Sequence, residues 1–294
     1  TKVVPARLQA HKESGGAVEL LRVPDPENKK PDQARFMSRG RLKRPGIKIL
    51  IGENALELVS KDEDGTVLLK TVSGQSIDSI LNNYGAIPLP PYIHRPEGPN
   101  EKDNQRYQTV FAAAPGAAAA PTAGLHFTDQ LLNQLRDGGI DIAKITLHVG
   151  PGTFMPVRVD DIREHKVLAE PTEISDETAH MVNRARYDKR PIIAVGTTVV
   201  RTLEGAASRV AEGTDIEPGW RREDMVVIPG HSFRVVNGLI TNFHLPKSSL
   251  LLLVSALVGR VRLLKAYEEA VREGYRFYSY GDAMYLPPSN WPNP

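Results

Sequence analysis

Residues 192–204 read Ile-Ile-Ala-Val-Gly-Thr-Thr-Val-Val-Arg-Thr-Leu-Glu. The first four form a continuous apolar run, which is typical of a strand buried on both faces of a sheet. The next three, Gly196-Thr197-Thr198, lead into a helical pattern over Val199–Ala211. A buried strand that runs through a glycine into a helix predicts an α/β domain.

The same alternation of strands and helices extends over residues 101–294. Thr128 predicts a helix N-cap and Gly138-Gly139 the end of that helix. Strands are predicted at Ile140–Val149, Gly238–Thr241 and Arg276–Tyr280. The further predicted helices cover Asn104–Ala114, Asp129–Arg136, Ser175–Arg186, Ser248–Arg260 and Leu263–Glu273.

The first 85 residues or so have a different pattern, with short apolar runs separated by turn residues. These runs predict a small antiparallel β-barrel. A short helix over Ile77–Asn82 and the extended, proline-rich Pro88–Tyr92 follow the barrel. The clearest strand runs are Ala17–Val23, Ile47–Ile51, Ala55–Val59 and Val67–Val72.

Composition narrows the classes of function. The chain has 294 residues, a formal net charge of +2 and no cysteine, which excludes disulfides, thiolate nucleophiles and cysteine-built metal sites. Its longest apolar run, Leu250–Val258, is too short to span a membrane. No signal peptide pattern is present, and we expect a cytoplasmic protein. Because Thr1 leads directly into the strand-like Lys2–Pro5, we expect further residues before it.

Four predicted strands end in loops of small, polar or histidine-bearing residues. Ligands of open α/β sheets bind beyond the carboxyl ends of the strands, where glycines let the backbone approach a ligand closely. These loops therefore predict a small-molecule site. They are Leu147–Thr153, Gly196–Thr198, Thr241–His244 and Tyr280–Ala283.

Common nucleotide and metal motifs are absent from the sequence. It contains no G-x-x-x-x-G-K-[ST], no G-x-G-x-x-G and no H-E-x-x-H. Since the histidines are far apart in sequence, we expect no metal site.

A basic run lies in the predicted barrel. Residues 29–48 contain eight Lys or Arg side chains and one acid, Asp32. Such a density can neutralise several phosphates, and the alternative is a solvated surface of the barrel. We assign contact with the phosphates of a nucleic acid to Arg39, Arg41, Lys43 and Arg44.

Several long motifs together resemble the S-adenosylmethionine:tRNA ribosyltransferase-isomerase family of queuosine biosynthesis. They cover nearly the whole chain in the order expected for that family. The segments are Ala120–Thr128, Thr146–Arg158, Ile193–Glu204, Thr241–Leu250 and Tyr275–Met284, with Thr1–Leu8 and Leu89–Ile93 on either side of the predicted barrel.

This resemblance implies a three-layer α/β/α domain, residues 1–5 plus 89–294, with a small antiparallel barrel of six-stranded type, residues 6–88, inserted in it. It implies that the ribosyl group of S-adenosylmethionine is transferred and isomerised onto 7-aminomethyl-7-deazaguanine at the tRNA wobble position. The products are epoxyqueuosine, adenine and methionine. S-adenosylmethionine is then a consumed co-substrate, with no tightly bound cofactor, and we expect a monomer. The family also carries several dozen residues upstream of Thr1, so the activity has to be measured on this polypeptide itself.

The implied reaction needs a base beside the sulfonium, a donor to the leaving adenine and a neutral amine. Histidine suits proton transfer near neutral pH. We therefore assign catalysis to His126, His148 and His244, with Asp282 holding a cationic group. The alternatives are that each histidine only hydrogen-bonds the backbone and that Asp282 pairs with Arg276.

The substrate contacts are assigned from the same motifs, each beside a structural alternative. The threonines could instead cap a helix, Arg201 could pair with Glu204, and Tyr278 and Tyr280 could share a packed strand face. The assigned residues are Gly150, Thr153, Arg158, Gly196, Thr197, Thr198, Arg201, Asn242, Phe243 and Tyr280.

Two other functions fit parts of the sequence. A conventional S-adenosylmethionine methyltransferase would leave S-adenosylhomocysteine in place of adenine and methionine. A non-catalytic RNA-binding module would bind tRNA in a salt-sensitive way without releasing adenine.

Overall fold

The computed structural model describes residues 1–150, 159 and 161–288 of the chain. These residues fold into two compact units. The small unit comprises Thr1–Gln108, Ala112–Ala120 and His148–Pro151. The large unit comprises Thr109–Phe111, Pro121–Leu147 and Gly152–Pro294.

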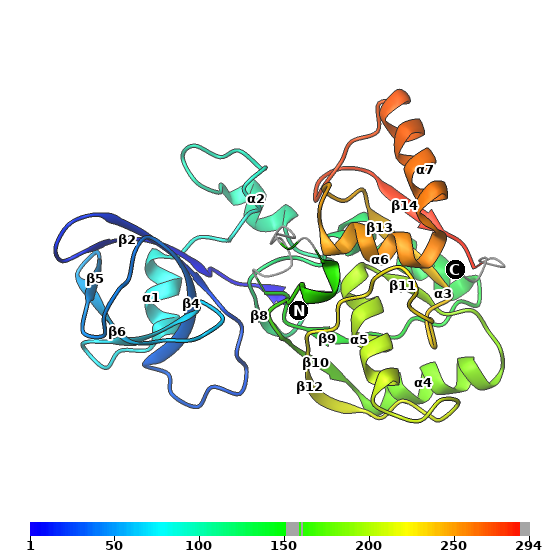
Figure 1. Cartoon of the computed structure of the whole chain (residues 1–294), viewed down its shortest axis with the longest axis horizontal. Coiled ribbons are helices and arrows are strands. Elements are labelled where there is room, and N and C mark those ends of the chain that lie inside the picture. Colours follow the sequence, from blue (N-terminus) through cyan, green and yellow to red (C-terminus); the bar gives the residue numbers. More distant parts are fainter. Residues whose placement is uncertain (151–158, 160, 289–294) are drawn as a thin grey trace. The chain divides into compact units, whose positions relative to one another are not determined.

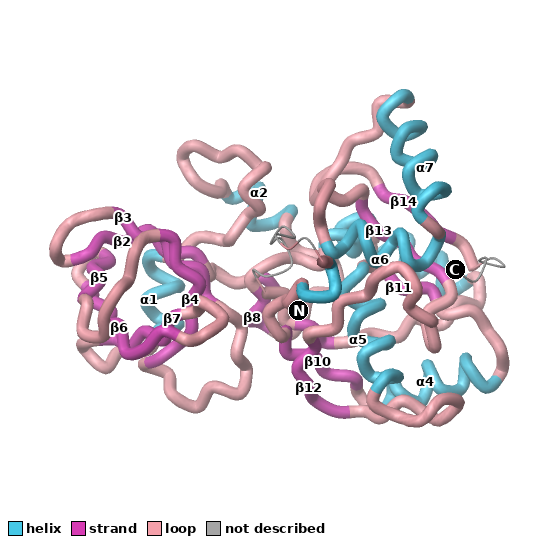
Figure 2. Tube along the Cα trace, viewed as in Figure 1, coloured by secondary structure: helices cyan, strands magenta, loops and turns pink. Residues whose placement is uncertain are grey.

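Six antiparallel strands of the small unit close into a barrel (Figures 1 and 2). Around the barrel their order is β2-β3-β4-β7-β6-β5. Because the barrel is closed, each of these strands is paired on both sides, which protects it from pairing with another chain. The strands are β2 (Arg7–Lys12), β3 (Ala17–Arg22), β4 (Gln33–Arg39), β5 (Lys48–Ile51), β6 (Asn54–Lys61) and β7 (Val67–Thr71).

The barrel interior is apolar because alternate residues of each strand point inward. In β2 these are Leu8 and Ala10, and in β5 Ile49 and Ile51. Helix α1 (Ile77–Tyr84) adds three side chains, Ile77, Ile80 and Leu81, to the same core. The Ser76 hydroxyl caps this helix by accepting the Asp78 N–H.

The rest of the small unit consists of short elements. Strand β1 (Lys2–Val3) pairs in parallel with β8 (Pro115–Ala117). Helix α2 (Glu101–Arg106) begins with a capping box between Asn100 and Asp103. The helix predicted over 104–114 is therefore wrong for most of its length, since the chain leaves α2 at Tyr107, which is fully buried.

The large unit contains two three-stranded sheets among its described residues. In the first, β10 (Glu170–Ile174) lies between β12 (Gly219–Glu223) and the two-residue β9 (Thr146–Leu147). In the second, β13 (Gly238–Asn242) lies between a parallel neighbour, β11 (Ile193–Val195), and an antiparallel one, β14 (Ala283–Leu286).

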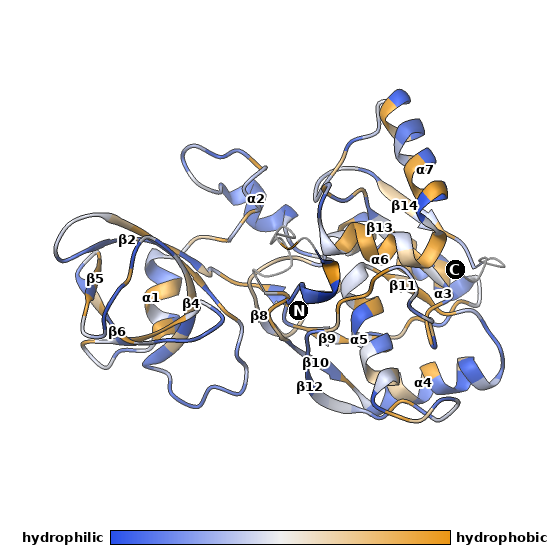
Figure 3. Ribbon diagram, in the orientation of Figure 1, coloured by the Kyte–Doolittle hydropathy of each residue, from blue (hydrophilic) through white to orange (hydrophobic). Residues whose placement is uncertain are grey.

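Helices pack their apolar faces into one core with the second sheet. Helix α6 is apolar along most of its length (Figure 3), and its Leu253, Val254 and Leu257 pack with Leu239 of β13. None of the helices in the described part of the chain has the length and apolar character needed to cross a bilayer. The helices are η1 (Thr122–His126), α3 (Asp129–Asp137), η3 (Ile162–Glu164), α4 (Asp176–Tyr187), α5 (Thr197–Ser208), α6 (Ser249–Val258) and α7 (Arg260–Arg272).

The predicted fold class, an α/β domain with an inserted antiparallel barrel, is confirmed. The predicted cap is also confirmed at Thr128, which accepts the Leu131 N–H. The helix predicted over Ser175–Arg186 is present as α4, and Ser175 caps it by accepting the Thr178 N–H. The long strand predicted over 140–149 is wrong, because within it only the two residues of β9 form a strand.

The strand predicted over 276–280 is also wrong, and with it the shared face of Tyr278 and Tyr280. Tyr278 has φ +73°, which breaks an extended strand. The Asp282 N–H donates to the Arg276 carbonyl at 2.7 Å, so the segment folds back on itself. The strand of this region is β14, which begins after the fold-back.

Glu204 of α5 fixes the segment that leads into β13. Its side chain is fully buried and accepts the backbone N–H groups of Arg234, Val235 and Val236 at 2.8–3.0 Å. Burial raises the pKa of Glu204, but the His231 imidazole and these N–H groups outweigh it and hold that pKa below its ordinary value of 4.5. The carboxylate therefore stabilises the fold only in its ionised form.

We predict that Glu204→Gln lowers the free energy of unfolding by about 1–3 kcal/mol at neutral pH, because the new amide nitrogen cannot accept the Arg234 N–H. The pKa of Glu204 is lower in the folded chain than in the unfolded chain. The loss of unfolding free energy in Glu204→Gln should therefore be complete above the unfolded-state pKa, and it should shrink as pH falls through the folded-state pKa.

Urea unfolding at a series of pH values measures this deficit, with the exposed Glu212→Gln as the matched control. A deficit of the same size at every pH would show that the Glu204 charge is not what holds residues 234–236.

Candidate active site

Three of the four predicted loops meet at one edge of the second sheet (Figure 1). Strands β11 and β13 are parallel, so both end at this edge, where the Gly196 N–H donates to the Ile240 carbonyl at 2.8 Å. The antiparallel β14 begins there, with Ala283 opposite Asn242. The loops after β11 and β13 and the loop before β14 are therefore neighbours.

The side chain of Asn242, at the end of β13, joins this edge to η1. Its Oδ1 accepts the Thr122 hydroxyl at 2.9 Å, and its Nδ2 lies 2.9 Å from His126 Nε2. Asn242 is 2% exposed. We call Thr122, His126, Asn242, His244 and Asp282 the β13-edge cluster.

Asp282 contributes the negative charge of the cluster. Its carboxylate accepts the Arg276 N–H at 2.7 Å, and the Arg276 guanidinium lies 3.4 Å away. The Arg276 N–H lowers the pKa of Asp282. Burial lowers the pKa of His126, and the Asp282 charge opposes that shift. At neutral pH the cluster thus pairs a carboxylate with a mainly neutral imidazole.

His244 lies two residues after Asn242 and is held at two points. Its Nε2 is 2.8 Å from the Thr241 hydroxyl oxygen, and its backbone N–H donates to the Tyr267 hydroxyl at 2.7 Å. Burial lowers the pKa of His244 to about 4. His244 is therefore neutral at neutral pH, and one of its two ring nitrogens carries no proton.

Phe243 points into an aromatic group beneath the same loop. Its ring centroid lies 5.0 Å from that of Phe277, 5.4 Å from Tyr267 and 5.8 Å from Tyr275. Phe243 is 4% exposed. Phe243 thus packs in the protein interior and anchors the loop that carries Asn242 and His244.

Glycines allow the close approach of the surrounding segments. Gly196 has φ +100° and is the N-cap of α5, with no side chain capping the helix. Thr197 and Thr198 follow it and are 5% and 7% exposed. In η1, a Cβ on Gly124 would lie 2.7 Å from the Phe111 ring and 2.8 Å from Thr109. A side chain at Gly124 would force Phe111 or Thr109 to move, and one at Gly196 would be strained by the positive φ.

Arg201 lies in the interior behind α5. Its guanidinium donates to the Glu170 carboxylate at 2.9 Å and to the carbonyls of Met225 and Glu223. Its predicted pairing with Glu204 is wrong, because Glu204 accepts backbone N–H groups instead. Arg201 thus has a structural role in joining α5 to the first sheet.

The remaining predicted residues are not part of the cluster. Tyr280 is half-buried in the fold-back before β14. His148 and Gly150 belong to the small unit, where burial lowers the pKa of His148. Thr153 and Arg158 lie outside the described residues.

The residues predicted to contact tRNA lie in one loop of the barrel and at the strand end before it. Arg39 ends β4, and Arg41, Lys43 and Arg44 follow it with exposed side chains. Between them Leu42 is 5% exposed and belongs to the barrel core. Leu42 therefore anchors the loop that carries these positive charges.

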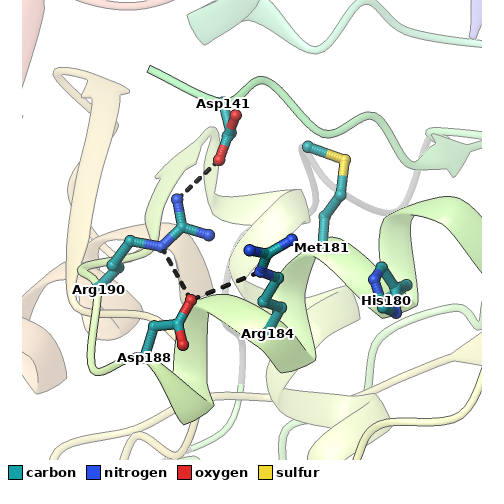
Figure 4. Close-up of a pocket in the computed structure, with 6 residues that line it drawn as sticks. All are labelled: Asp141, His180, Met181, Arg184, Asp188 and Arg190. Carbon is teal, nitrogen blue, oxygen red and sulfur yellow. Dashed lines mark hydrogen bonds and ion pairs between the residues drawn. The ribbon is translucent and has the colours of Figure 1, made fainter. Parts of the chain in front are cut away.

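A separate pocket on the large unit does not contain any residue predicted from the sequence. It lies beside α4 and is lined by Asp141, His180, Met181, Arg184, Asp188 and Arg190 (Figure 4). Arg190 pairs with Asp141 at 2.7 Å, and both Arg184 and Arg190 approach Asp188. Its charges largely neutralise one another. Within the described ranges, no group of three or more Asp, Glu, His or Cys side chains could hold a metal ion.

Two residues of this site, Thr122 and Tyr267, were not predicted from the sequence, and Thr241 was predicted only as part of its loop. Thr122 and Thr241 lie inside the motifs that carry the resemblance, so their hydroxyls were a usable signal. Tyr267 lies on α7, where its spacing is that of an ordinary helix residue. Only the folded chain brings its hydroxyl to His244.

Comparisons with known proteins identify a family for the chain. The model of the family described as "Queuosine biosynthesis protein" matches residues 1–286. An S-adenosylmethionine:tRNA ribosyltransferase-isomerase of Geotalea uraniireducens is 46% identical over 287 residues, which are 97% of this chain and 82% of that protein. The protein of the same name from Carboxydothermus hydrogenoformans is 46% identical with the same coverage.

Among solved structures, an S-adenosylmethionine tRNA ribosyltransferase of Thermotoga maritima is 30% identical, with a TM-score of 0.46, covering 97% of this chain and 80% of that one. The extent of the family match and the identity to the Geotalea and Carboxydothermus relatives establish the classification. The chain belongs to the queuosine biosynthesis protein family.

Proposed function

We propose that this chain is an S-adenosylmethionine:tRNA ribosyltransferase-isomerase. It transfers and isomerises the ribosyl group of S-adenosylmethionine onto 7-aminomethyl-7-deazaguanine of tRNA, giving epoxyqueuosine, adenine and methionine. The names of its relatives support this activity. S-adenosylmethionine is a consumed substrate, and we propose a monomer acting in the cytoplasm.

The observation that carries the proposal is the β13-edge cluster. His126 and Asn242 are 116 positions apart in sequence and 2.9 Å apart in the structure. The charge of the Asp282 carboxylate acts on His126, and a second histidine, His244, follows Asn242 by two residues and bonds to Thr241. A site with two mainly neutral imidazoles and one carboxylate suits a reaction that moves protons beside a cationic sulfur.

Within this cluster we assign His244 as the base that removes a proton beside the sulfonium. Its lowered pKa keeps it neutral, so the proton-accepting form dominates at neutral pH. Asp282 would hold the positive charge of the sulfonium or the amine. His126 faces the same charge and would contact the leaving group. His148, in the small unit, remains a fourth proposed catalytic residue.

The neighbouring glycine and threonine residues would hold S-adenosylmethionine. Backbone N–H groups at the start of α5 offer donors for a carboxylate or a ribose. The proposed contacts in the large unit are Gly196, Thr197, Thr198, Asn242, Phe243 and Tyr280. Gly150, Thr153 and Arg158 remain proposals from the sequence. We do not propose that Arg201 binds substrate, because its guanidinium already donates hydrogen bonds to Glu170 and to two backbone carbonyls.

We propose that tRNA contacts the barrel through Arg39, Arg41, Lys43 and Arg44. The Arg39 guanidinium lies 3.8 Å from the Glu19 carboxylate, which offsets part of its charge. The other three extend into solvent from the loop that Leu42 anchors. The proposed domain boundaries are residues 6–88 for the barrel domain and 1–5 plus 89–294 for the large domain.

Incubation of the chain with S-adenosylmethionine and a tRNA that carries 7-aminomethyl-7-deazaguanine at the wobble position tests the activity. We expect free adenine and methionine in equal amounts. Formation of S-adenosylhomocysteine would indicate a methyltransferase instead. Salt-sensitive tRNA binding without any adenine would indicate an RNA-binding protein.

We predict that replacing Arg41, Lys43 and Arg44 together by Ala weakens tRNA binding and flattens its salt dependence. For each phosphate that the loop no longer neutralises, the slope of log K against log salt should fall by about 0.7–0.9. Filter binding at several salt concentrations measures both. A matched control removes three other exposed charges of the small unit, Lys2, Lys61 and Lys102. Equal slopes for the two triple variants would mean that the loop is an ordinary solvated surface.

We predict that His244→Gln lowers kcat for adenine release by about 100-fold or more, with little change in KM, because removal of a general base acts on turnover. In NMR titrations His244 should have its midpoint at about 4. The exposed His180→Gln of the same unit is the control. Equal decreases in kcat and in substrate affinity would assign His244 a positioning role.

A further inference from the structure

Both ends of the Asn242 side chain are engaged within the protein. The Thr122 hydroxyl donates to Oδ1 at 2.9 Å, and Nδ2 faces His126 Nε2 at 2.9 Å. With Asn242 2% exposed, its amide is a fixed link between η1 and β13.

The direction of this link determines which nitrogen of His126 carries the proton. An amide nitrogen only donates, so Nδ2 of Asn242 requires His126 Nε2 to accept. A neutral imidazole has one N–H group, and that group must then be on Nδ1. In the structure the Thr122 hydroxyl donates to Oδ1, which leaves Nδ2 directed at the ring.

The other ring nitrogen of His126 is Nδ1. Among the described residues, no group hydrogen-bonds to Nδ1 of His126. The charged groups near the ring are Asp282 and its ion-pair partner Arg276. The Nδ1–H group is therefore available to a ligand.

We propose that Asn242 and Thr122 are positioning residues that fix His126 as a hydrogen-bond donor through Nδ1. The donor would face a hydrogen-bond acceptor of the substrate, such as a ring nitrogen of the purine that leaves. This last step rests on the proposed function, whereas the tautomer does not. His126 is then a donor, and the role of base is left to His244.

The tautomer is tested without any activity. Two-bond ¹H–¹⁵N correlation spectra distinguish Nδ1–H from Nε2–H imidazoles, and the His126→Gln variant identifies the His126 signals by their disappearance. We expect the Nδ1–H pattern for His126 in the unmodified chain. An Nε2–H pattern overturns the proposal, because it means that the amide of Asn242 is turned the other way.

Variants at Thr122 test what sets the orientation. Thr122→Val removes the hydroxyl but keeps the shape, so Asn242 should turn and His126 should show both tautomers. Thr122→Ser restores the hydroxyl and should restore the single Nδ1–H pattern. If Thr122→Val keeps that pattern, Thr122 is not the residue that orients the amide.

Asn242→Asp tests the donor role of His126 through the pH dependence of adenine release, which a merely structural role of Asn242 would leave unchanged. The new carboxylate accepts from Nε2–H, so the neutral ring loses its Nδ1 donor and the pKa of His126 rises. Adenine release at neutral pH should fall by about 100-fold. It should partly recover below the raised pKa, since the imidazolium carries protons on both nitrogens.

Asn242→Ala should lose activity without any recovery at acidic pH. If Asn242→Asp and Asn242→Ala have the same pH profile, the donor role of His126 is wrong. If the NMR result holds but neither the unmodified chain nor any variant releases adenine, the proposed function has failed and the tautomer assignment stands.

Discussion

The parallel pairing of β11 with β13 is the constraint on which the site depends. It brings Gly196 and Asn242 to the same edge, and the antiparallel β14 adds Asp282 to it. The buried carboxylate of Glu204 holds residues 234–236, from which β13 starts. Removing any of these interactions would separate residues that are neighbours only through the sheet.

Much of the architecture could be predicted from local patterns. The turn residues and alternating runs of 47–59 predicted the hairpin of β5 and β6, and Thr128 and Ser175 predicted two helix starts. β4 was not predicted because Gln33, Arg35 and Arg39 are polar or charged, which obscured the alternation of Ala34 and Phe36. The aromatic alternation of 276–280 was typical of a strand, but Tyr278 has a positive φ and the chain folds back.

The candidate site was predictable only in its parts. Histidine, glycine and threonine at strand ends were visible in the sequence, whereas their partners were not. Nothing local indicates that Arg201 pairs with Glu170, 31 positions away, or that Tyr267 reaches the His244 backbone, 23 positions away. Such interactions depend on packing between separate elements, so motif position alone cannot separate a catalytic residue from a buried structural one.

The central claim is that the β13-edge cluster is where S-adenosylmethionine reacts. A crystal structure of the chain with S-adenosylmethionine tests it most directly. We predict the sulfonium beside Asp282, with His126 and His244 in contact with the ligand. A ligand bound elsewhere in the large unit, for example in the α4 pocket of Figure 4, would contradict it.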